Sequence, residues 1–250
     1  MPVNGTRLIL ALWLTLWGAV APYAAVLQVA VASNAIVPVR QIVRAFEART
    51  GAQVYLSPGS TGRHYAQILN GAPFQVFLAA DAERPRLLEA EGHALPGTRV
   101  SWAIGQLVLF SPQPGLVDTL GQVLGTGDFR HIALANPTLA PYGLAARETL
   151  EALGLWHALQ DRIVLGENVA QAWQFVASGS AELGFVAASQ LLADEGSLSG
   201  SRWAVPDSLH SPVIQQAVLL KDDPLARQFL EFLVGDEARA ILRAAGYGLP

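Results

Sequence analysis

The chain has 250 residues, which fits one or two compact domains with a sizeable hydrophobic core. Charged residues make up only 14% of the chain and the net charge is −4, with no block of basic residues, so we expect no nucleic-acid partner. The absence of cysteine excludes disulfides and a lipid attached to an N-terminal cysteine.

Residues 1–25 have the pattern of a secretory signal peptide. Arg7 precedes an apolar run that starts at Leu8, and alanine-rich sequence follows it. The run is too short to span a bilayer comfortably, which makes a membrane anchor the weaker interpretation. We therefore expect this segment to be cleaved near Ala24 or Ala25, leaving a free, soluble exported protein.

Strands and helices alternate from residue 26 onward. Short apolar runs rich in β-branched residues end in polar or glycine-containing sequence, and apolar residues at helical spacing follow them. This alternation is typical of an α/β domain with a mainly parallel sheet. The first predicted strands and helices are, in turn, 27–34 and 35–50, 52–56 and 63–71, and 74–81 and 82–92.

A long apolar strand, 101–112, and a turn-rich segment, 113–130, interrupt this alternation. The predicted elements after them are strands at 131–143, 162–168 and 182–189, helices at 144–154 and 169–179, a second long strand at 211–220, and helices at 223–234 and 236–246. We therefore expect an α/β fold of two lobes, with mainly parallel sheets, joined by two hinge strands. Lobe I would contain 26–105 and 213–250, lobe II 106–212, and the ligand would bind in the cleft between them.

Four segments stand where a predicted strand meets a predicted helix. The first turn of a helix has N–H groups without intrahelical partners and a partial positive charge, so converging helix starts can bind an anion without a cationic side chain. Capping alone also explains each segment, because serine, threonine and asparagine are the preferred N-cap residues. The four segments are Ser33–Asn34, Ser60–Thr61–Gly62, Pro141–Tyr142–Gly143 and Asn168–Val169.

Other candidate sites have weaker support. His64 could act as a base for Ser60, but the sequence "PGSTG" is not a nucleophile elbow, and no acidic residue follows closely to orient the imidazole. We expect His64 on the exposed first turn of its helix and Arg63 pointing into solvent. The histidines lack metal-binding spacing, so no metal site is predicted.

The sequence resembles the periplasmic molybdate-binding proteins of ABC importers, within the type II periplasmic binding proteins. The segments that carry the resemblance include "VASNA", "SPGSTGRHYAQILNGAPFQVFLAAD", "ANPTLAPYGLAARETLEALGLW" and "ELGFVAAS". The resemblance extends through nearly all of the chain after the signal peptide. It implies a protein that closes on molybdate or tungstate and delivers it to a membrane permease, as a monomer, without a cofactor and without catalysis.

The resemblance also implies the ligand-binding residues. Some family members place a binding tyrosine where this chain has Ala187, whereas another branch places it in "APYG", which corresponds to Tyr142 here. The implied set is Ser33, Asn34, Ser60, Thr61, Tyr142 and the main-chain N–H of Val169.

The residue types suit a fully ionised tetrahedral dianion. Such an ion needs hydrogen-bond donors on every oxygen and no acceptor, and hydroxyls with helix-start amides supply donors. None of the four segments contains an acidic residue that could accept the proton of a phosphate. Sulfate passes the same electrostatic test, so its exclusion would depend on cavity size. Ferric ion and a small organic acid remain alternatives, and a serine hydrolase is the alternative of another class.

Overall fold

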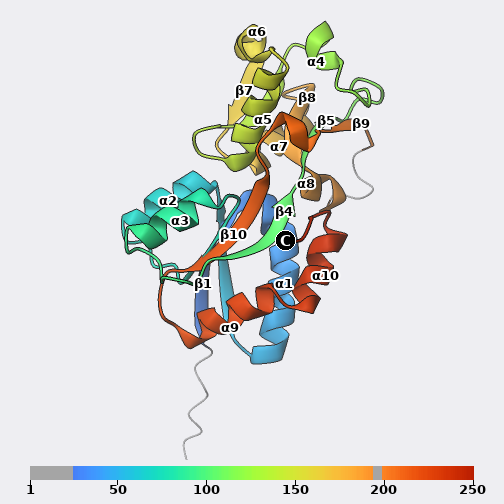
Figure 1. Ribbon diagram of the computed structural model, residues 1–250. Coiled ribbons are helices and arrows are strands. Elements are labelled where there is room, and N and C mark those ends of the chain that lie inside the picture. Colours follow the sequence, from blue (N-terminus) through green and yellow to red (C-terminus); the bar gives the residue numbers. More distant parts are fainter. Residues whose placement is uncertain (1–24, 194–198) are drawn as a thin grey trace, which may run out of the picture.

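The computed structural model describes residues 25–193 and 199–250. Figure 1 shows two α/β lobes, one above the other, and each contains one five-stranded sheet. We call the lobe with β1–β4 and β10 lobe I and the lobe with β5–β9 lobe II. The predicted signal peptide lies outside the described residues except for Ala25.

The sheet of lobe I has the strand order β2-β1-β3-β10-β4. Its first strands end at the polar segments that the sequence singled out, so the carboxyl ends of β1 and β2 carry Ser33 and Ser60. The strands are β1 (Val26–Ala32), β2 (Gln53–Gly59), β3 (Val76–Ala79), β4 (Val100–Gly105) and β10 (Val213–Leu219).

Helices cover both faces of this sheet, as the alternation along β1 requires. Leu27, Val29 and Val31 pack in one apolar cluster with α1, α9 and α10, while Ala30 packs in the other cluster with α2 and α3. Successive side chains of a strand point to opposite faces, so a strand buried on both sides reads as a continuous apolar run. The helices are α1 (Ile36–Thr50), α2 (Thr61–Leu69), α3 (Glu83–Ala90), α9 (Pro224–Leu233) and α10 (Asp236–Ala244), and the 3₁₀ turn η1 (Ser33–Ala35) precedes α1.

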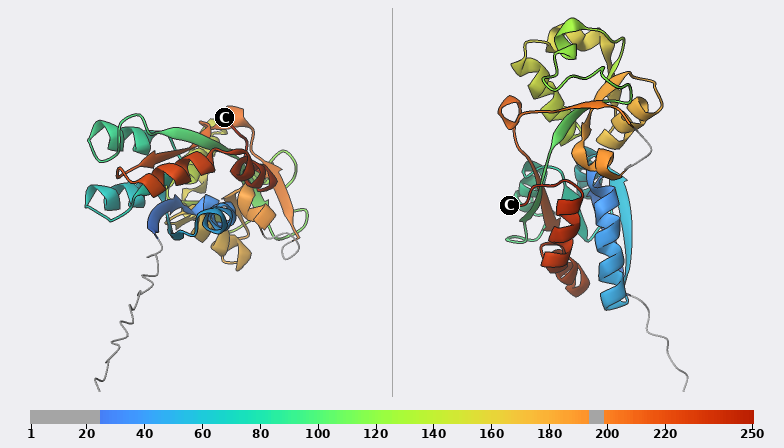
Figure 2. Two further views of the ribbon diagram at one scale, coloured as in Figure 1. Left: turned by 90° about the horizontal axis from the view of Figure 1, so that it is seen from below. Right: turned by 90° about the vertical axis from the view of Figure 1, so that its right-hand side faces the viewer.

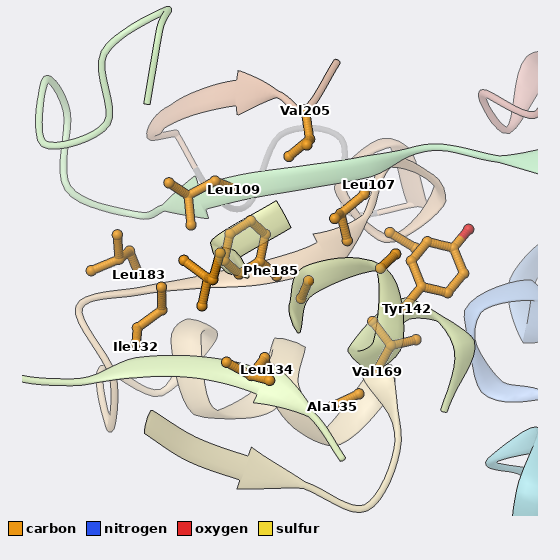
Figure 3. Close-up of a cluster of buried hydrophobic side chains, with 14 of the residues drawn as sticks. Leu107, Leu109, Ile132, Leu134, Ala135, Tyr142, Val169, Leu183, Phe185 and Val205 are labelled. Carbon is orange, nitrogen blue, oxygen red and sulfur yellow. The ribbon is translucent and has the colours of Figure 1, made fainter. Parts of the chain in front are cut away.

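The sheet of lobe II has the order β7-β6-β8-β5-β9 and is built in the same way. Leu107 and Leu109 face the larger cluster (Figure 3), and Val108 and Phe110 face the smaller one. The strands are β5 (Leu107–Ser111), β6 (Ile132–Ala135), β7 (Ile163–Gly166), β8 (Leu183–Ala187) and β9 (Ser201–Ala204). The helices are α4 (Val123–Thr126), α5 (Pro141–Ala152), α6 (Trp156–Leu159), α7 (Val169–Ala177) and α8 (Ala188–Ala193), with 3₁₀ turns η2 (Gln160–Arg162) and η3 (Asp207–Leu209).

Two segments connect the lobes. The predicted long strand 101–112 is two strands, because the chain leaves the sheet of lobe I at Gly105 and joins that of lobe II at Leu107. The chain returns through residues 205–212 into β10, which pairs with β4. Figures 1 and 2 show β4 and β10 side by side below lobe II and the C-terminal helices back against α1. The predicted two-lobed α/β fold is confirmed.

The sheets are mixed rather than mainly parallel. Each has two parallel and two antiparallel strand pairings. The strand-helix units give the parallel pairs, whereas β4, β5, β9 and β10, which flank the connections, pair antiparallel with their neighbours. We propose that lobe I comprises residues 26–105 and 213–250 and lobe II residues 106–212, as predicted from the sequence.

No helix among the described residues is both long enough and apolar enough to cross a bilayer.

Candidate ligand-binding site

The four predicted helix-start segments converge on one pocket between the lobes. Its cavity volume is only about 10 Å³, far below the roughly 300–1,000 Å³ of pockets for drug-sized molecules. Lobe I contributes Ala32, Ser33, Asn34, Gly59, Ser60, Thr61 and Ala80, and lobe II contributes Ala140, Pro141, Tyr142, Asn168 and Val169. No charged side chain lines it within the described part of the chain.

A second pocket is larger but is not lined by helix-start residues. Its cavity volume is about 500 Å³, and its wall includes parts of β9 and α8. The wall is mainly apolar and contains none of the four helix-start segments. The smaller pocket is therefore the candidate site.

The start of α2 presents a hydroxyl and one free amide to this pocket. The N–H of Gly62 donates to the carbonyl of Leu139 in lobe II at 2.8 Å, and the N–H of Arg63 donates to Ser60 Oγ at 3.4 Å. Within the described residues, this leaves the N–H of Thr61 without a partner. Ser60 therefore caps the helix as an acceptor and still has its own proton to donate.

Thr61 plays a different part from the one expected of a ligand-binding hydroxyl. Its Oγ1 accepts the N–H of Ala80 at 3.0 Å, and the residue is 1% exposed. The side chain thus ties the start of α2 to the end of β3, while the main chain faces the pocket.

The starts of α5 and α7 each have one main-chain N–H group without a hydrogen-bond partner among the described residues. Asn168 caps α7 through Oδ1, which accepts from Ala170 and Gln171 at 3.0 and 3.1 Å, so the N–H of Val169 remains. At α5, Pro141 has no N–H, and among the described residues the N–H of Tyr142 has no partner. Helix-start N–H groups of this kind are natural donors to an anion.

Asn34 faces the pocket with its main chain, since its side chain is committed elsewhere. Its Nδ2 donates to Gln215 Oε1 at 3.0 Å and to Tyr247 Oη at 2.8 Å, which uses both amide protons. Ser33 beside it is 5% exposed and lines the pocket.

The hydroxyl of Tyr142 is buried and has no hydrogen-bond partner in the described structure. Figure 3 shows the ring at the margin of the apolar cluster of lobe II, with its oxygen pointing away from that cluster. A Cβ on Gly105 would lie 2.1 Å from this oxygen, so only glycine leaves room for it. Burial raises the pKa of Tyr142 well above 10, which keeps the hydroxyl protonated as a donor. Tyr247 and Asn34 lie near enough to this hydroxyl to affect its pKa, but it makes no hydrogen bond within the described residues, so its proton is available to a ligand.

Arg63 points away from the pocket, as expected, but it is paired. Its Nη1 lies 2.6 Å from Glu167 Oε1, with the two side chains 57% and 41% exposed. This ion pair crosses from lobe I to lobe II, as does the hydrogen bond from Arg84 Nη2 to the carbonyl of Thr138 at 2.9 Å. Together with the Gly62 contact, these bonds hold the lobes closed over the pocket.

The expectation that His64 is exposed is wrong. The residue is 3% exposed, its ring lies edge-on to Phe74 and Phe77, and Nδ1 is 3.0 Å from Gln67 Oε1. Burial lowers the pKa of His64, so the ring is neutral at neutral pH. A Cβ on Gly59 would lie 2.7 Å from its Nε2, so the imidazole packs directly under the pocket wall. The first turn of α2 points inward because α3 and β3 cover it.

Sequence reasoning missed the buried polar residues behind the pocket. Ser189, Gln215 and Tyr247 surround Asn34, and none of them lies in a helix-start segment. The paired glutamines in the apolar strand "VIQQAVLL" were a visible signal for Gln215. Within residues 25–193 and 199–250, no cluster of histidine, aspartate and glutamate could hold a metal ion.

Comparisons with known proteins connect this geometry to a family. The family model described as "Bacterial extracellular solute-binding protein" matches residues 27–248. The chain is 48% identical, over the whole of both chains, to the molybdate-binding protein ModA of Azotobacter vinelandii. It is 45% identical to ModA of Rhodobacter capsulatus, over 87% of this chain and 86% of that one.

A solved structure gives the same result. The periplasmic molybdate-binding protein of Azotobacter vinelandii superposes with a TM-score of 0.86 and 46% identity, covering 90% of this chain and 99% of that one. The resemblance to periplasmic molybdate-binding proteins is thus confirmed. The chain belongs to the family of bacterial extracellular solute-binding proteins.

Proposed function

We propose that this protein captures molybdate, or tungstate, in the pocket between its lobes and delivers it to an ABC permease. The observation that carries the proposal is the donor set of that pocket. It combines hydroxyls with helix-start amides from both lobes and includes the buried, unpartnered hydroxyl of Tyr142. Such a set matches an anion that needs a donor on every oxygen.

The donors that we assign to the ligand are neutral. They are the hydroxyls of Ser33, Ser60 and Tyr142 and the main-chain N–H groups of Asn34, Thr61 and Val169. The partial positive charge at the starts of α2, α5 and α7 supplies the electrostatic attraction that a cationic side chain would otherwise provide.

The relatives support molybdate over other tetrahedral anions. The two ModA proteins, at 48% and 45% identity, are named for molybdate binding. Sulfate would satisfy the same donors, so we assign its exclusion to the shape of the closed pocket. Because the family consists of solute-binding proteins, a role in capture and transport is preferred to catalysis.

The setting follows from the family. The relatives imply a periplasmic location, and we propose that residues 1–25 direct export and are cleaved. The mature protein would then act as a monomer, with the permease as its partner and no cofactor or nucleic acid.

A serine hydrolase has no support from the geometry. The Ser60 hydroxyl accepts from the N–H of Arg63, and in the described structure it makes no hydrogen bond to His64. The buried His64 contacts Gln67 rather than an acid that would orient it.

Isothermal titration calorimetry of the purified mature protein against molybdate, tungstate, sulfate and phosphate tests the proposal. We expect one site per chain for molybdate and tungstate, with sulfate and phosphate at least about a hundredfold weaker, which corresponds to roughly 2.8 kcal/mol. Preferential binding of sulfate, or no binding of any of the four anions, would overturn it.

A further inference from the structure

A buried polar network lies directly behind the pocket and joins the two lobes. Ser189 Oγ donates to the main-chain carbonyl of Asn34 at 2.9 Å, and Tyr247 Oη lies 3.0 Å from the same carbonyl and 3.2 Å from Ser189 Oγ. Gln215 accepts from the side chain of Asn34. All four residues are at most 5% exposed.

The members of this network come from both sides of the cleft. Asn34 lies on η1 at the pocket wall, Gln215 on β10, and Tyr247 after α10, so these three belong to lobe I. Ser189 lies on α8, which directly follows β8 of lobe II, also packs against α1 and η1, and falls within the proposed limits of lobe II. The bond between Ser189 and Asn34 is therefore a contact between lobes, made by a residue that does not line the pocket.

The network fixes Asn34 at three points. Its amide protons go to Gln215 and Tyr247, and its carbonyl accepts from Ser189 and from the Tyr247 hydroxyl. With these groups committed, the main-chain N–H is what this residue can offer a ligand. A fixed peptide orients that N–H without further loss of conformational entropy on binding.

We propose that Ser189 is a positioning residue for ligand retention, which adds a second hydrogen bond to the Asn34 carbonyl only when the lobes are closed. Gln215 and Tyr247 move with Asn34 as parts of lobe I, so their bonds to Asn34 persist when the cleft opens. The bonds of Ser189 to Asn34 and to Tyr247 are lost on opening. They therefore stabilise the closed, ligand-bound state alone. This inference rests on the proposed function.

The kinetic signature of this role is a change in release without a change in capture. A bond made only after closure slows opening but does not alter the encounter with the ligand. Loss of one buried neutral hydrogen bond should speed the release of molybdate from Ser189→Ala about fivefold. The association rate should stay within about twofold of that of the unmodified protein, as for most interface changes.

Ser111→Ala is the matched control. Ser111 is also a buried serine of lobe II, and its Oγ donates to a main-chain carbonyl, that of Glu182, at 2.6 Å. Both partners of this bond lie within lobe II. Ser111→Ala should lower the melting temperature and leave the release rate unchanged.

Release is measured by loading each protein with radioactive molybdate and chasing with excess unlabelled molybdate. The association rate follows from the release rate and the equilibrium Kd. Faster release from Ser189→Ala with normal release from Ser111→Ala supports the proposal. Tyr247→Phe removes the hydroxyl that bonds Ser189 and should also speed release. It replaces Ser189→Ala as the test variant if Ser189→Ala does not fold.

Two results would overturn this inference. One is a release rate of Ser189→Ala equal to that of the unmodified protein, and the other is an equal acceleration in Ser111→Ala. In both cases the unmodified protein still binds molybdate, so the proposed function stands. If the unmodified protein does not retain molybdate at all, the proposed function fails first and this inference fails with it.

Discussion

Tyr142 and Tyr247 are both buried near the pocket, but their hydroxyls have different surroundings. The hydroxyl of Tyr247 contacts Asn34 and Ser189, whereas that of Tyr142 has no partner in the described residues. Burial raises the pKa of Tyr247 to about 12 and that of Tyr142 well above 10, so both are neutral donors at working pH. One hydroxyl supports the structure, and the other is available to a ligand.

Tyr142→Phe should weaken molybdate binding by about tenfold to a hundredfold, because a donor to a buried charged acceptor contributes roughly 1.5–3 kcal/mol. The melting temperature of the free protein should not fall, since the hydroxyl makes no internal hydrogen bond. Tyr247→Phe is the matched comparison and should lower the melting temperature. Calorimetry and thermal unfolding of both variants measure these effects. Normal binding by Tyr142→Phe would remove its hydroxyl from the ligand set.

For single residues, the sequence predicts which of them line the pocket better than it predicts what their side chains contact. Residue types at strand-to-helix turns identified Ser60 and Val169 as pocket residues, because capping chemistry and pocket chemistry use the same atoms. Sequence could not show that the side chain of Asn34 faces the hinge, because Gln215 and Tyr247 are far away in the chain. The burial of His64 was equally hidden, since it depends on the packing of α2 against Phe74 and Phe77.

Helix α2 illustrates how one element serves both binding and closure. Its start presents Ser60 and the N–H of Thr61 to the pocket, and its next residues contact lobe II through Gly62 and Arg63. A Cβ on Gly62 would lie 2.9 Å from the carbonyl of Leu139, so the close approach of the lobes requires glycine there. In the proposed function, the same turn would therefore bind the ligand and contact the other lobe.

Arg63→Ala should raise the molybdate Kd by less than about fivefold. The pair with Glu167 is exposed, and exposed ion pairs contribute about 0.2–1 kcal/mol. The effect should shrink as salt rises, because salt screens exposed charges. Arg49→Ala is the control, since the pair of Arg49 with Glu237 lies within lobe I and should not affect Kd. Calorimetry at low and high salt measures both, and a loss beyond about tenfold would place Arg63 on the ligand.

The order of elements was predictable, but the pairing of the hinge strands was not. Strand-helix alternation fixed the parallel pairs, such as β1 with β2 and β6 with β7. The break at Gln106 within the apolar run 101–112 was not predicted, because the strands on both sides of it are similarly apolar. The sheet that a strand joins depends on where the other lobe lies, which is a property of the whole fold.

The two lobes explain how neutral groups can hold a dianion. Of the six proposed donors, lobe I presents four and lobe II two, so the proposed shell is complete only when the cleft is closed. Closure also removes water, which strengthens each hydrogen bond to the ion. Ligand binding and closure of the cleft are therefore coupled. Opening the cleft would release the ligand to a partner that favours the open form.

The most direct test of binding between the lobes is anomalous diffraction at the molybdenum absorption edge from crystals of the protein grown with molybdate. We predict a peak in the pocket between β1, β2 and the starts of α2, α5 and α7, within hydrogen-bond distance of Ser60 Oγ, Tyr142 Oη and the N–H of Val169, with no charged side chain in contact. A peak outside this pocket, or one in contact with Arg63 or His64, would contradict a site built from neutral donors.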